Sequence, residues 1–168
     1  VKIDNVKFIG NQAGSTGGAI SGVAAKSGTT TYAAKITITN STFEDNYAKG
    51  NGGALYAVNS TTLSVSGSTF KNNKTATNGG ALYTASSAVK VTFTNCLFEG
   101  NEAVADAGAM FLDWYAATSS IKGCTFANNK AKRGGALFVK GGTSGKMTIG
   151  GTGDEGCTFI GNEANDAG

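Results

Sequence analysis

The chain has 168 residues, enough for one domain with a hydrophobic core, and it contains 26 glycines, no proline, no histidine and only 15% charged residues. A hydrophobic content of 40% argues against disorder, and the net charge of +3 is too small and too scattered to indicate a nucleic-acid partner. No stretch approaches the roughly 18–20 apolar residues of a membrane span, so we expect membrane attachment only through an anchor outside this sequence.

The dominant feature of the sequence is an internal repeat. A Phe-x-x-Asn motif occurs six times, with intervals of 35, 27, 28, 28 and 33 residues between its phenylalanines. The six copies are Phe8/Asn11, Phe43/Asn46, Phe70/Asn73, Phe98/Asn101, Phe126/Asn129 and Phe159/Asn162. Eight or nine residues after each of the first five phenylalanines comes GGAI, GGAL or AGAM, at residues 17–20, 52–55, 79–82, 107–110 and 134–137. A repeat in such register predicts a solenoid.

Each repeat contains the signals of short strands and tight corners. Apolar and hydroxyl side chains alternate in segments such as Leu63-Ser64-Val65-Ser66, which is typical of a strand with one inward face. Three residues before each Phe only Asn or Gly occurs, the two residues that most readily adopt the left-handed conformation of a corner. This corner column consists of Asn5, Asn40, Gly67, Asn95, Gly123 and Gly156.

These signals predict a right-handed parallel β-helix with three short strands per rung and about five to six rungs. Residues 1–168 then form a single segment of a longer repeat array, with rungs near 1–35, 36–62, 63–90, 91–118, 119–148 and 149–168. The two long intervals predict insertions near 27–34 and 141–155. Stacked rungs should pile Phe on Phe inside and Asn on Asn at a corner, and Asn amides can hydrogen-bond from rung to rung. A helical solenoid is excluded because no segment shows a 3.6-residue period with caps.

The pairing of GGA[I/L/V] with FxxN, seen for example at Gly52–Leu55 and Phe43–Asn46, resembles the repeat of the chlamydial-type polymorphic outer-membrane proteins, which are autotransporter adhesins. The resemblance covers almost the whole chain and implies a β-helical passenger exported to the cell surface and used in adhesion. AGAM at 107–110 departs from the family pattern, and no membrane-anchoring barrel is present in this sequence.

Catalytic, cofactor and metal sites are not expected. The lack of histidine removes the Ser-His-Asp triad and the imidazole metal site. Four residues past Phe, Lys74, Glu102, Lys130 and Glu163 alternate on consecutive rungs, which indicates a surface ion-pair ladder instead of an acid–base pair. The segment 150–155 is weakly similar to a calcium-binding glycine-rich repeat but occurs once, which favours an inserted turn.

Three cysteines, Cys96, Cys124 and Cys157, occupy one column whose earlier members are Val6, Ser41 and Ser68. The column favours small inward side chains, so free thiols in the core are expected. A disulfide between neighbouring rungs stays an alternative, although parallel side-chain vectors make its geometry poor.

An aromatic column follows GGAL by one residue. Tyr56, Tyr83, Phe111 and Phe138 should face outward if the leucines face inward, and Trp114 lies near the end of the same strand. An exposed apolar stripe usually marks a contact surface. Intramolecular packing of these rings, or a reversed register with the rings in the core, are the alternatives.

The sequence as a whole favours a non-enzymatic, extracellular or cell-surface module that acts in adhesion or as a structural stalk. Its expected partners are a host or neighbouring cell-surface protein or glycan, or another copy of itself. A polysaccharide lyase or hydrolase is the alternative, because many β-helices belong to that class. An ice-binding protein is a further alternative, because Thr37/Thr39, Ser64/Ser66 and Thr92/Thr94 form an outward hydroxyl array.

Overall fold

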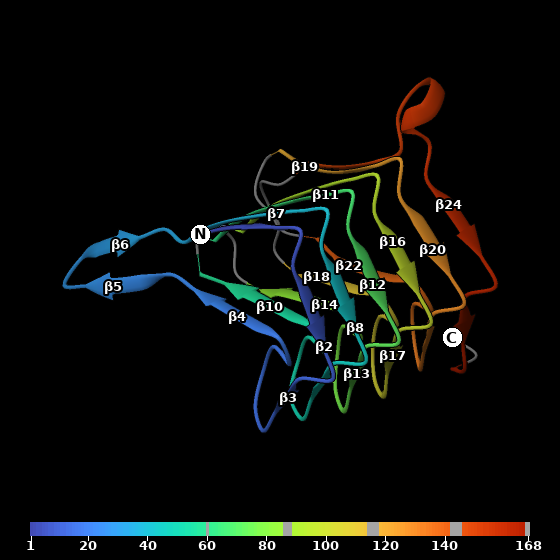
Figure 1. Cartoon of the computed structure of the whole chain (residues 1–168), viewed down its shortest axis with the longest axis horizontal. Coiled ribbons are helices and arrows are strands. Elements are labelled where there is room, and N and C mark those ends of the chain that lie inside the picture. The colour runs from blue at the N-terminus through green and yellow to red at the C-terminus, as the bar shows by residue number, and fades with distance from the viewer. Residues whose placement is uncertain (60, 86–88, 114–117, 142–145, 167–168) are drawn as a thin grey trace.

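In the computed structural model, the chain coils into a parallel β-solenoid of short strands (Figure 1). The structure describes residues 1–168 except 60, 86–88, 114–117, 142–145 and 167–168. Each turn of the coil, or rung, contributes one strand to each of four parallel sheets, which we call sheets A to D in the order in which the chain enters them. The prediction of a right-handed parallel β-helix is confirmed.

Sheets A and B contain the strands before and after the first corner of each rung. Sheet A consists of β1 (Lys2–Asp4), β7 (Lys35–Thr39), β11 (Thr62–Ser66), β15 (Lys90–Thr94), β19 (Ser119–Lys122) and β23 (Met147–Ile149). Sheet B consists of β2 (Lys7–Ile9), β8 (Thr42–Glu44), β12 (Thr69–Lys71), β16 (Leu97–Glu99), β20 (Thr125–Ala127) and β24 (Thr158–Ile160).

Sheets C and D complete each rung. Sheet C consists of the two-residue strands β3 (Gln12–Ala13), β9 (Tyr47–Ala48), β13 (Lys74–Thr75), β17 (Glu102–Ala103), β21 (Lys130–Ala131) and β25 (Glu163–Ala164). Sheet D consists of β4 (Ile20–Val23), β10 (Leu55–Val58), β14 (Leu82–Ala85), β18 (Met110–Asp113) and β22 (Leu137–Lys140).

A rung therefore contains four short strands, where the sequence predicted three. The extra strand arises because a second corner precedes the ladder asparagine, in a column that contains only Gly, Asn and Asp. Its six members, Gly10, Asp45, Asn72, Gly100, Asn128 and Gly161, all have φ between 53° and 66°. The chain therefore turns between sheets B and C as well as between sheets A and B.

The predicted corner column is left-handed at five of its six positions, with φ from 49° at Asn40 to 58° at Gly123. Gly156 is the exception, with φ of −58°, so the prediction for this residue is wrong. The reason is an insertion: a short 3-10 helix, η1 (Gly153–Glu155), separates β23 from β24. Gly150 takes the left-handed conformation directly after β23, with φ of 82°.

The two predicted insertions are only partly extra structure. The first contains the hairpin of β5 (Ala25–Ser27) and β6 (Thr30–Tyr32), the one antiparallel pair among the described residues, which projects from the coil in Figure 1. In the second, residues 147–149 are the regular sheet A strand of their rung, which corrects the predicted range.

The core is a set of side-chain columns parallel to the solenoid axis. The six repeat phenylalanines stand in single file, with ring centroids 4.7–5.0 Å apart and interplanar angles of 3–10°. The inward side chains of sheet A, such as Ile38, Leu63 and Phe93, are fully buried beside them. This packing supplies the apolar burial that one rung alone cannot achieve.

The ladder residues of the two terminal rungs are more exposed than those between them. Asn11 is exposed and Asn162 is half-buried, whereas the four ladder asparagines between them are fully buried. Phe159 is likewise 47% exposed, although its ring stacks on that of Phe126. The physical reason is that each of these positions has a neighbouring described rung on one side only. Asn11, Asn162 and Phe159 therefore belong to the predicted ladders but are more exposed than the inner members, and Phe8 is likewise only partly buried.

The hydrogen bonds of the two end asparagines are one-sided for the same reason. The backbone and side-chain amides of Asn11 donate to Oδ1 of Asn46, at 3.0 and 2.8 Å. At the other end, Oδ1 of Asn162 accepts from the backbone and side-chain amides of Asn129, at 3.0 and 2.8 Å. Asn162 also donates a 2.8 Å hydrogen bond to the carbonyl oxygen of Phe126. Asn11 and Asn162 thus continue the ladder but do not link rungs on both sides, as the inner asparagines do.

Candidate functional site

Four aromatic side chains form a continuous column on the outward face of sheet D. Tyr56, Tyr83, Phe111 and Phe138 lie opposite one another from β10 to β22. Successive ring centroids are 5.6, 4.9 and 5.1 Å apart, with interplanar angles of 5°, 16° and 7°. We call these four residues the aromatic column. Trp114, which the sequence adds to this site, lies outside the described residues.

The direction of the column follows from strand alternation. Leu55, Leu82 and Met110 are completely buried, so the residue after each of them faces outward. The alternative of a reversed register is therefore wrong. Phe111 faces outward and stacks between the rings of Tyr83 and Phe138, and it is only 6% exposed.

The stacked arrangement determines which ring surfaces are accessible. Tyr56, Tyr83 and Phe138 are half-buried: the rings of Tyr56 and Phe138 each stack on one neighbour, and that of Tyr83 stacks on two. Ring edges remain at the surface. Tyr56 is different, because the residue opposite it on β4 is Ser21, which leaves one ring face without an aromatic neighbour. The sequence could not show this, because alternation gives the side of a sheet and not the tilt of a ring.

Charged residues lie at the end of the column near β22. The Arg133 guanidinium lies 5.3 Å from the centre of the Phe138 ring, a cation–π contact. The same guanidinium donates two hydrogen bonds to Asp106, of 2.7 and 2.8 Å. These hydrogen bonds and the charge of Asp106 raise the pKa of Arg133 above its ordinary value. The arginine is thereby held over the ring as a permanent cation.

Tyr83 has the most perturbed hydroxyl of the column. Burial, the nearby Asp113 carboxylate and Tyr56 raise the pKa of Tyr83 above its usual value of 10.0. Asp113 in turn lies 3.4 Å from the Lys140 ammonium. The Tyr83 hydroxyl therefore stays protonated at neutral pH and can donate a hydrogen bond to a partner.

The cysteine column has a structural use. The Sγ–H groups of Cys96 and Cys124 donate to the carbonyl oxygens of Thr94 and Lys122, both at 3.3 Å, as the hydroxyls of Ser41 and Ser68 do to Thr39 and Ser66 at 2.7 and 2.9 Å. Cys96, Cys124 and Cys157 are free thiols, of which the first two are buried. The hydrogen bond to Cys96, together with burial, raises the pKa of the Cys124 thiol, which makes it a poor nucleophile.

Most of the carboxylates form ion pairs with lysine or arginine residues of a neighbouring rung. Seven of the eleven acidic residues pair with a lysine or arginine within the described residues: Glu99, Glu102, Asp106, Asp113, Glu155, Glu163 and Asp166. The alternating column forms the pairs Lys74–Glu102 at 3.0 Å and Lys130–Glu163 at 3.2 Å. Within the part of the chain that the structure describes, no three potential metal ligands cluster.

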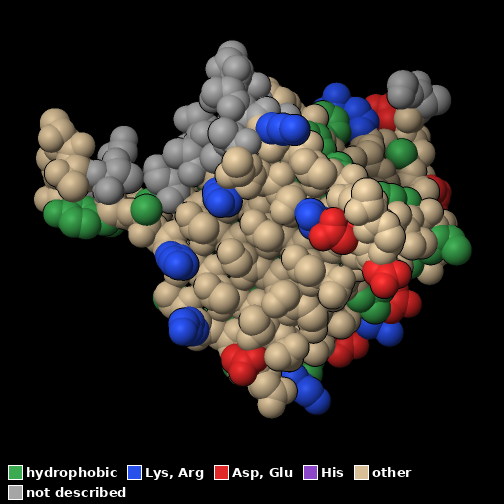
Figure 2. All heavy atoms as spheres, turned by 90° about the horizontal axis from the view of Figure 1, so that it is seen from above, with side chains coloured by type: hydrophobic (Ala, Val, Ile, Leu, Met, Phe, Trp, Pro, Cys, Tyr) green, Lys and Arg blue, Asp and Glu red, His purple; other side chains and the backbone are tan. Residues whose placement is uncertain are grey.

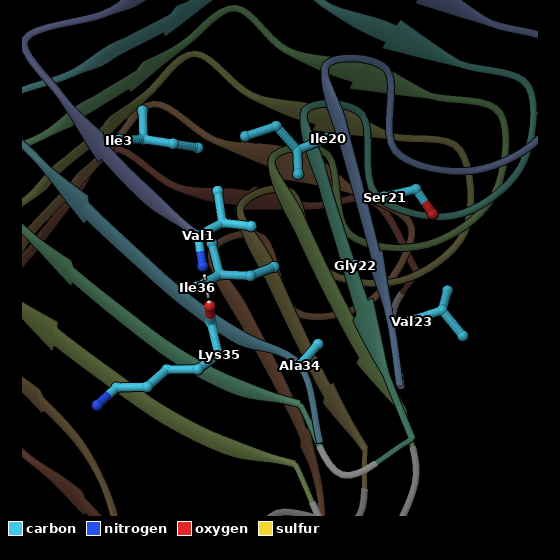
Figure 3. Close-up of a pocket in the computed structure, with 9 residues that line it drawn as sticks. All are labelled: Val1, Ile3, Ile20, Ser21, Gly22, Val23, Ala34, Lys35 and Ile36. Atoms are coloured by element: carbon cyan, nitrogen blue, oxygen red, sulfur yellow. Dashed lines mark hydrogen bonds between the residues drawn. The ribbon is translucent and has the colours of Figure 1, made fainter. Parts of the chain in front are cut away.

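A cavity of about 290 Å³ lies at the first rung (Figure 3). Ile3, Ile20 and Ile36 contribute apolar side chains to it, and the Val1 ammonium donates a 2.7 Å hydrogen bond to the Lys35 carbonyl at its rim. The lining belongs to strands β1, β4 and β7, so the cavity continues the apolar interior of the coil. Its lining contains no carboxylate, thiol or imidazole.

The four parallel sheets and their stacked columns define the class of the protein as a parallel β-solenoid. The chain belongs to the right-handed beta helix region family, whose model matches residues 1–166. No curated protein and no solved structure matches the chain. Among the described residues, no helix is long and apolar enough to cross a membrane.

Proposed function

We propose that the chain is a non-enzymatic module of a secreted or surface-displayed protein, and that it acts in adhesion or as a structural stalk. The observation that carries the proposal is the aromatic column of Tyr56, Tyr83, Phe111 and Phe138, an outward stripe that crosses four rungs of sheet D. Aromatic residues are enriched in the cores of protein interfaces, where they supply large contact areas.

The repeat motifs support the cell-surface assignment. FxxN paired with GGA[I/L/V] resembles the repeat of the polymorphic outer-membrane proteins, in which a β-helical passenger is displayed outside the cell. A β-helix suits such display because stacked rungs extend a rod without the need for a larger core.

The engagement of the acidic residues supports a non-enzymatic role. A polysaccharide hydrolase needs two carboxylates facing each other across a substrate site. Here most carboxylates accept from a lysine or arginine on a neighbouring rung, for example Glu102 from Lys74 and Asp106 from Arg133. The polar residues of the repeat thus serve to hold rungs together.

The tilt of the rings favours a protein partner for the aromatic column. Ring faces are used within the column, so a sugar can stack only at Tyr56, whereas ring edges and the Tyr83 hydroxyl suit a flat protein surface. A host or neighbouring cell-surface protein is therefore the partner class we propose for this face.

The test is the triple variant Tyr56→Ser, Tyr83→Ser and Phe138→Ser, measured with fluorescently labelled chain on cultured epithelial cells by flow cytometry. We expect binding to fall at least about tenfold, while the β-sheet circular dichroism is retained. The matched control changes three half-buried, outward threonines of sheet B, Thr42→Ala, Thr69→Ala and Thr125→Ala, and should bind like the wild type.

Two results would count against the proposal. If the triple variant binds as the wild type does, the aromatic column is not the adhesive surface. If the variant loses its circular dichroism signal, the rings are part of the packing that holds the rungs together.

A further inference from the structure

The outward face of sheet A is a broad polar surface, which Figure 2 shows from above. Hydroxyl side chains occupy its columns in register: Thr37, Ser64 and Thr92 lie opposite one another, as do Thr39, Ser66 and Thr94. All six are half-buried, which leaves their hydroxyls at the surface. The uncharged expanse in Figure 2 is bordered by both lysine and acidic side chains.

Three lysines in one column of this face recur at every second rung, while Lys2, Asp4 and Lys122 lie in the neighbouring hydroxyl columns. Lys35 and Lys90 lie opposite Thr62 on its two sides, so that they are two rungs apart. Lys146 adds a third member two rungs further on, where its carbonyl oxygen accepts a 3.2 Å hydrogen bond from the amide of Ser119. All three side chains are exposed. Two rungs correspond to ~9.6 Å along the axis.

Six other lysines of the coil form ion pairs with carboxylates, whereas these three, like Lys2, Lys7 and Lys49, form none within the described residues. Lys71, Lys74 and Lys130, on sheets B and C, each pair with a glutamate one rung later, at 3.0–3.5 Å. Within the described residues, no ion pair involves Lys35, Lys90 or Lys146. The row therefore holds positive charge that stabilises nothing within the fold.

We propose that the outward face of sheet A binds a linear acidic polysaccharide, which lies along the solenoid axis across the strands. Acidic groups contact the row of Lys35, Lys90 and Lys146, and sugar hydroxyls hydrogen-bond with the threonine and serine columns. The ~9.6 Å spacing is comparable with the length of one disaccharide, so a polymer with one acidic group on every second sugar fits the row. This site is separate from the aromatic column and does not depend on it.

The spacing favours a polysaccharide over a nucleic acid. A nucleic-acid strand carries one phosphate per ~3.4 Å, so a lysine every ~9.6 Å would contact only about one phosphate in three. The hydroxyl columns suit the many hydroxyls of a sugar chain, which act as both donors and acceptors, and among them the Thr39 hydroxyl already donates to Asp4.

The test measures binding of the whole chain to a hyaluronan decasaccharide, which has one carboxylate per disaccharide, by isothermal titration calorimetry at low salt. A neutral cello-oligosaccharide and a single-stranded DNA of similar length serve as comparison probes. We expect binding of hyaluronan that weakens as salt rises, and at least about tenfold weaker binding by the triple variant Lys35→Gln, Lys90→Gln and Lys146→Gln.

The matched control is Lys71→Gln, Lys74→Gln and Lys130→Gln, which lowers the net charge by the same three units but leaves sheet A intact. It should bind hyaluronan within about twofold of the wild type, as should the variant of the aromatic column. Absence of hyaluronan binding, equal losses in the two lysine variants, or DNA binding as tight and as dependent on Lys35, Lys90 and Lys146 would each overturn the proposal.

Discussion

The side-chain amide of Asn101 donates a 2.9 Å hydrogen bond to the Oδ1 atom of Asn129, one rung further along the coil. The same Nδ2 group donates at 2.9 Å to the carbonyl oxygen of Phe70, on the preceding rung. Asn101 in turn accepts from both the backbone and side-chain amides of Asn73, at 3.0 and 2.9 Å. One fully buried side chain thus links three rungs.

Replacement of this residue should therefore be costly. Asn101→Ala removes the acceptor of the buried backbone amide of Asn73 and one hydrogen bond each from the Asn73 side-chain amide, the Asn129 Oδ1 atom and the Phe70 carbonyl oxygen, so we expect a loss of about 3 kcal/mol in the free energy of unfolding. Chemical denaturation measures it. The control is Asn165→Ala, at an exposed position, which should change stability by less than about 0.5 kcal/mol. Similar stabilities for the two variants would show that the buried ladder does not hold the rungs.

Ala107 occupies a corner where the other rungs have glycine. Its φ is 64°, in the left-handed region, where a side chain costs roughly 1–2 kcal/mol. We expect Ala107→Gly to raise the free energy of unfolding by about 0.5–1 kcal/mol, because relief of strain exceeds the added entropy of the unfolded chain. The reciprocal change, Gly79→Ala, places a Cβ against the carbonyl oxygen of Leu82 and should destabilise. Thermal melting of both variants shows whether each stability changes in the expected direction. An A107G variant less stable than the wild type would show that Ala107 is not strained.

The thiols should differ in their reactivity. Cys96 and Cys124 are 3% and 1% exposed, whereas Cys157 is half-buried. In the folded chain we expect a chromogenic disulfide reagent to label Cys157 first and the other two only after unfolding. Cys124→Ser should fold normally, because Ser41 and Ser68 make the equivalent hydrogen bonds. Rapid labelling of all three native thiols would contradict this packing.

Tyr83 should make stability fall at alkaline pH. Its pKa is raised in the folded chain, so above the ordinary value of 10.0 the unfolded chain loses this proton more readily than the folded one. Stability is therefore lost as the pH rises from about 10 through the folded pKa. We expect Tyr83→Phe to lose less stability than the wild type between pH 9 and pH 11.5, as measured by denaturation. Parallel pH curves for the two proteins would exclude the effect.

The sequence predicts the architecture because residues of the same type recur at similar intervals along the chain. The inward columns of phenylalanine and the first corner column were both visible as alignments of like residues. The second corner column is also present in the sequence, since Asp45, Asn72 and Gly100 share the same tolerance of positive φ, although the three-strand prediction does not contain it. A two-residue strand such as Lys74–Thr75 has no periodicity of its own, and only that corner column indicates it.

Copies of the Phe-x-x-Asn motif have the same sequence but differ in how deeply their side chains are buried. Asn11 and Asn162 belong to the same motif as the inner asparagines, yet the first is exposed and the second only half-buried. Burial of a ladder residue depends on the rungs above and below it, and a motif read along the chain does not contain that information. Gly156 was mispredicted for a related reason, because an insertion moved the left-handed turn to Gly150.

Other features depend on distances that a one-dimensional pattern does not contain. The alternation of Leu55 and Tyr56 gave the side of sheet D, but the parallel stacking of the rings that half-buries the aromatic column depends on rung spacing and side-chain rotamers. Lys71 forms an ion pair with Glu99 on the next rung, whereas Lys35 forms none within the described residues. Both facts depend on which residues of neighbouring rungs lie side by side, and the sequence alone does not give this.

The repeat residues hold the rungs together, so that the outward faces are free to bind a partner. Hydrogen exchange of the asparagine side-chain amides tests most directly whether the ladder is buried. Asn46, Asn73, Asn101 and Asn129 are fully buried, so NMR should show their Nδ2 protons exchanging at least about a hundredfold more slowly than those of the exposed Asn40 and Asn165. Equally fast exchange in both groups would contradict a buried ladder, and with it the assignment of function to the outward faces.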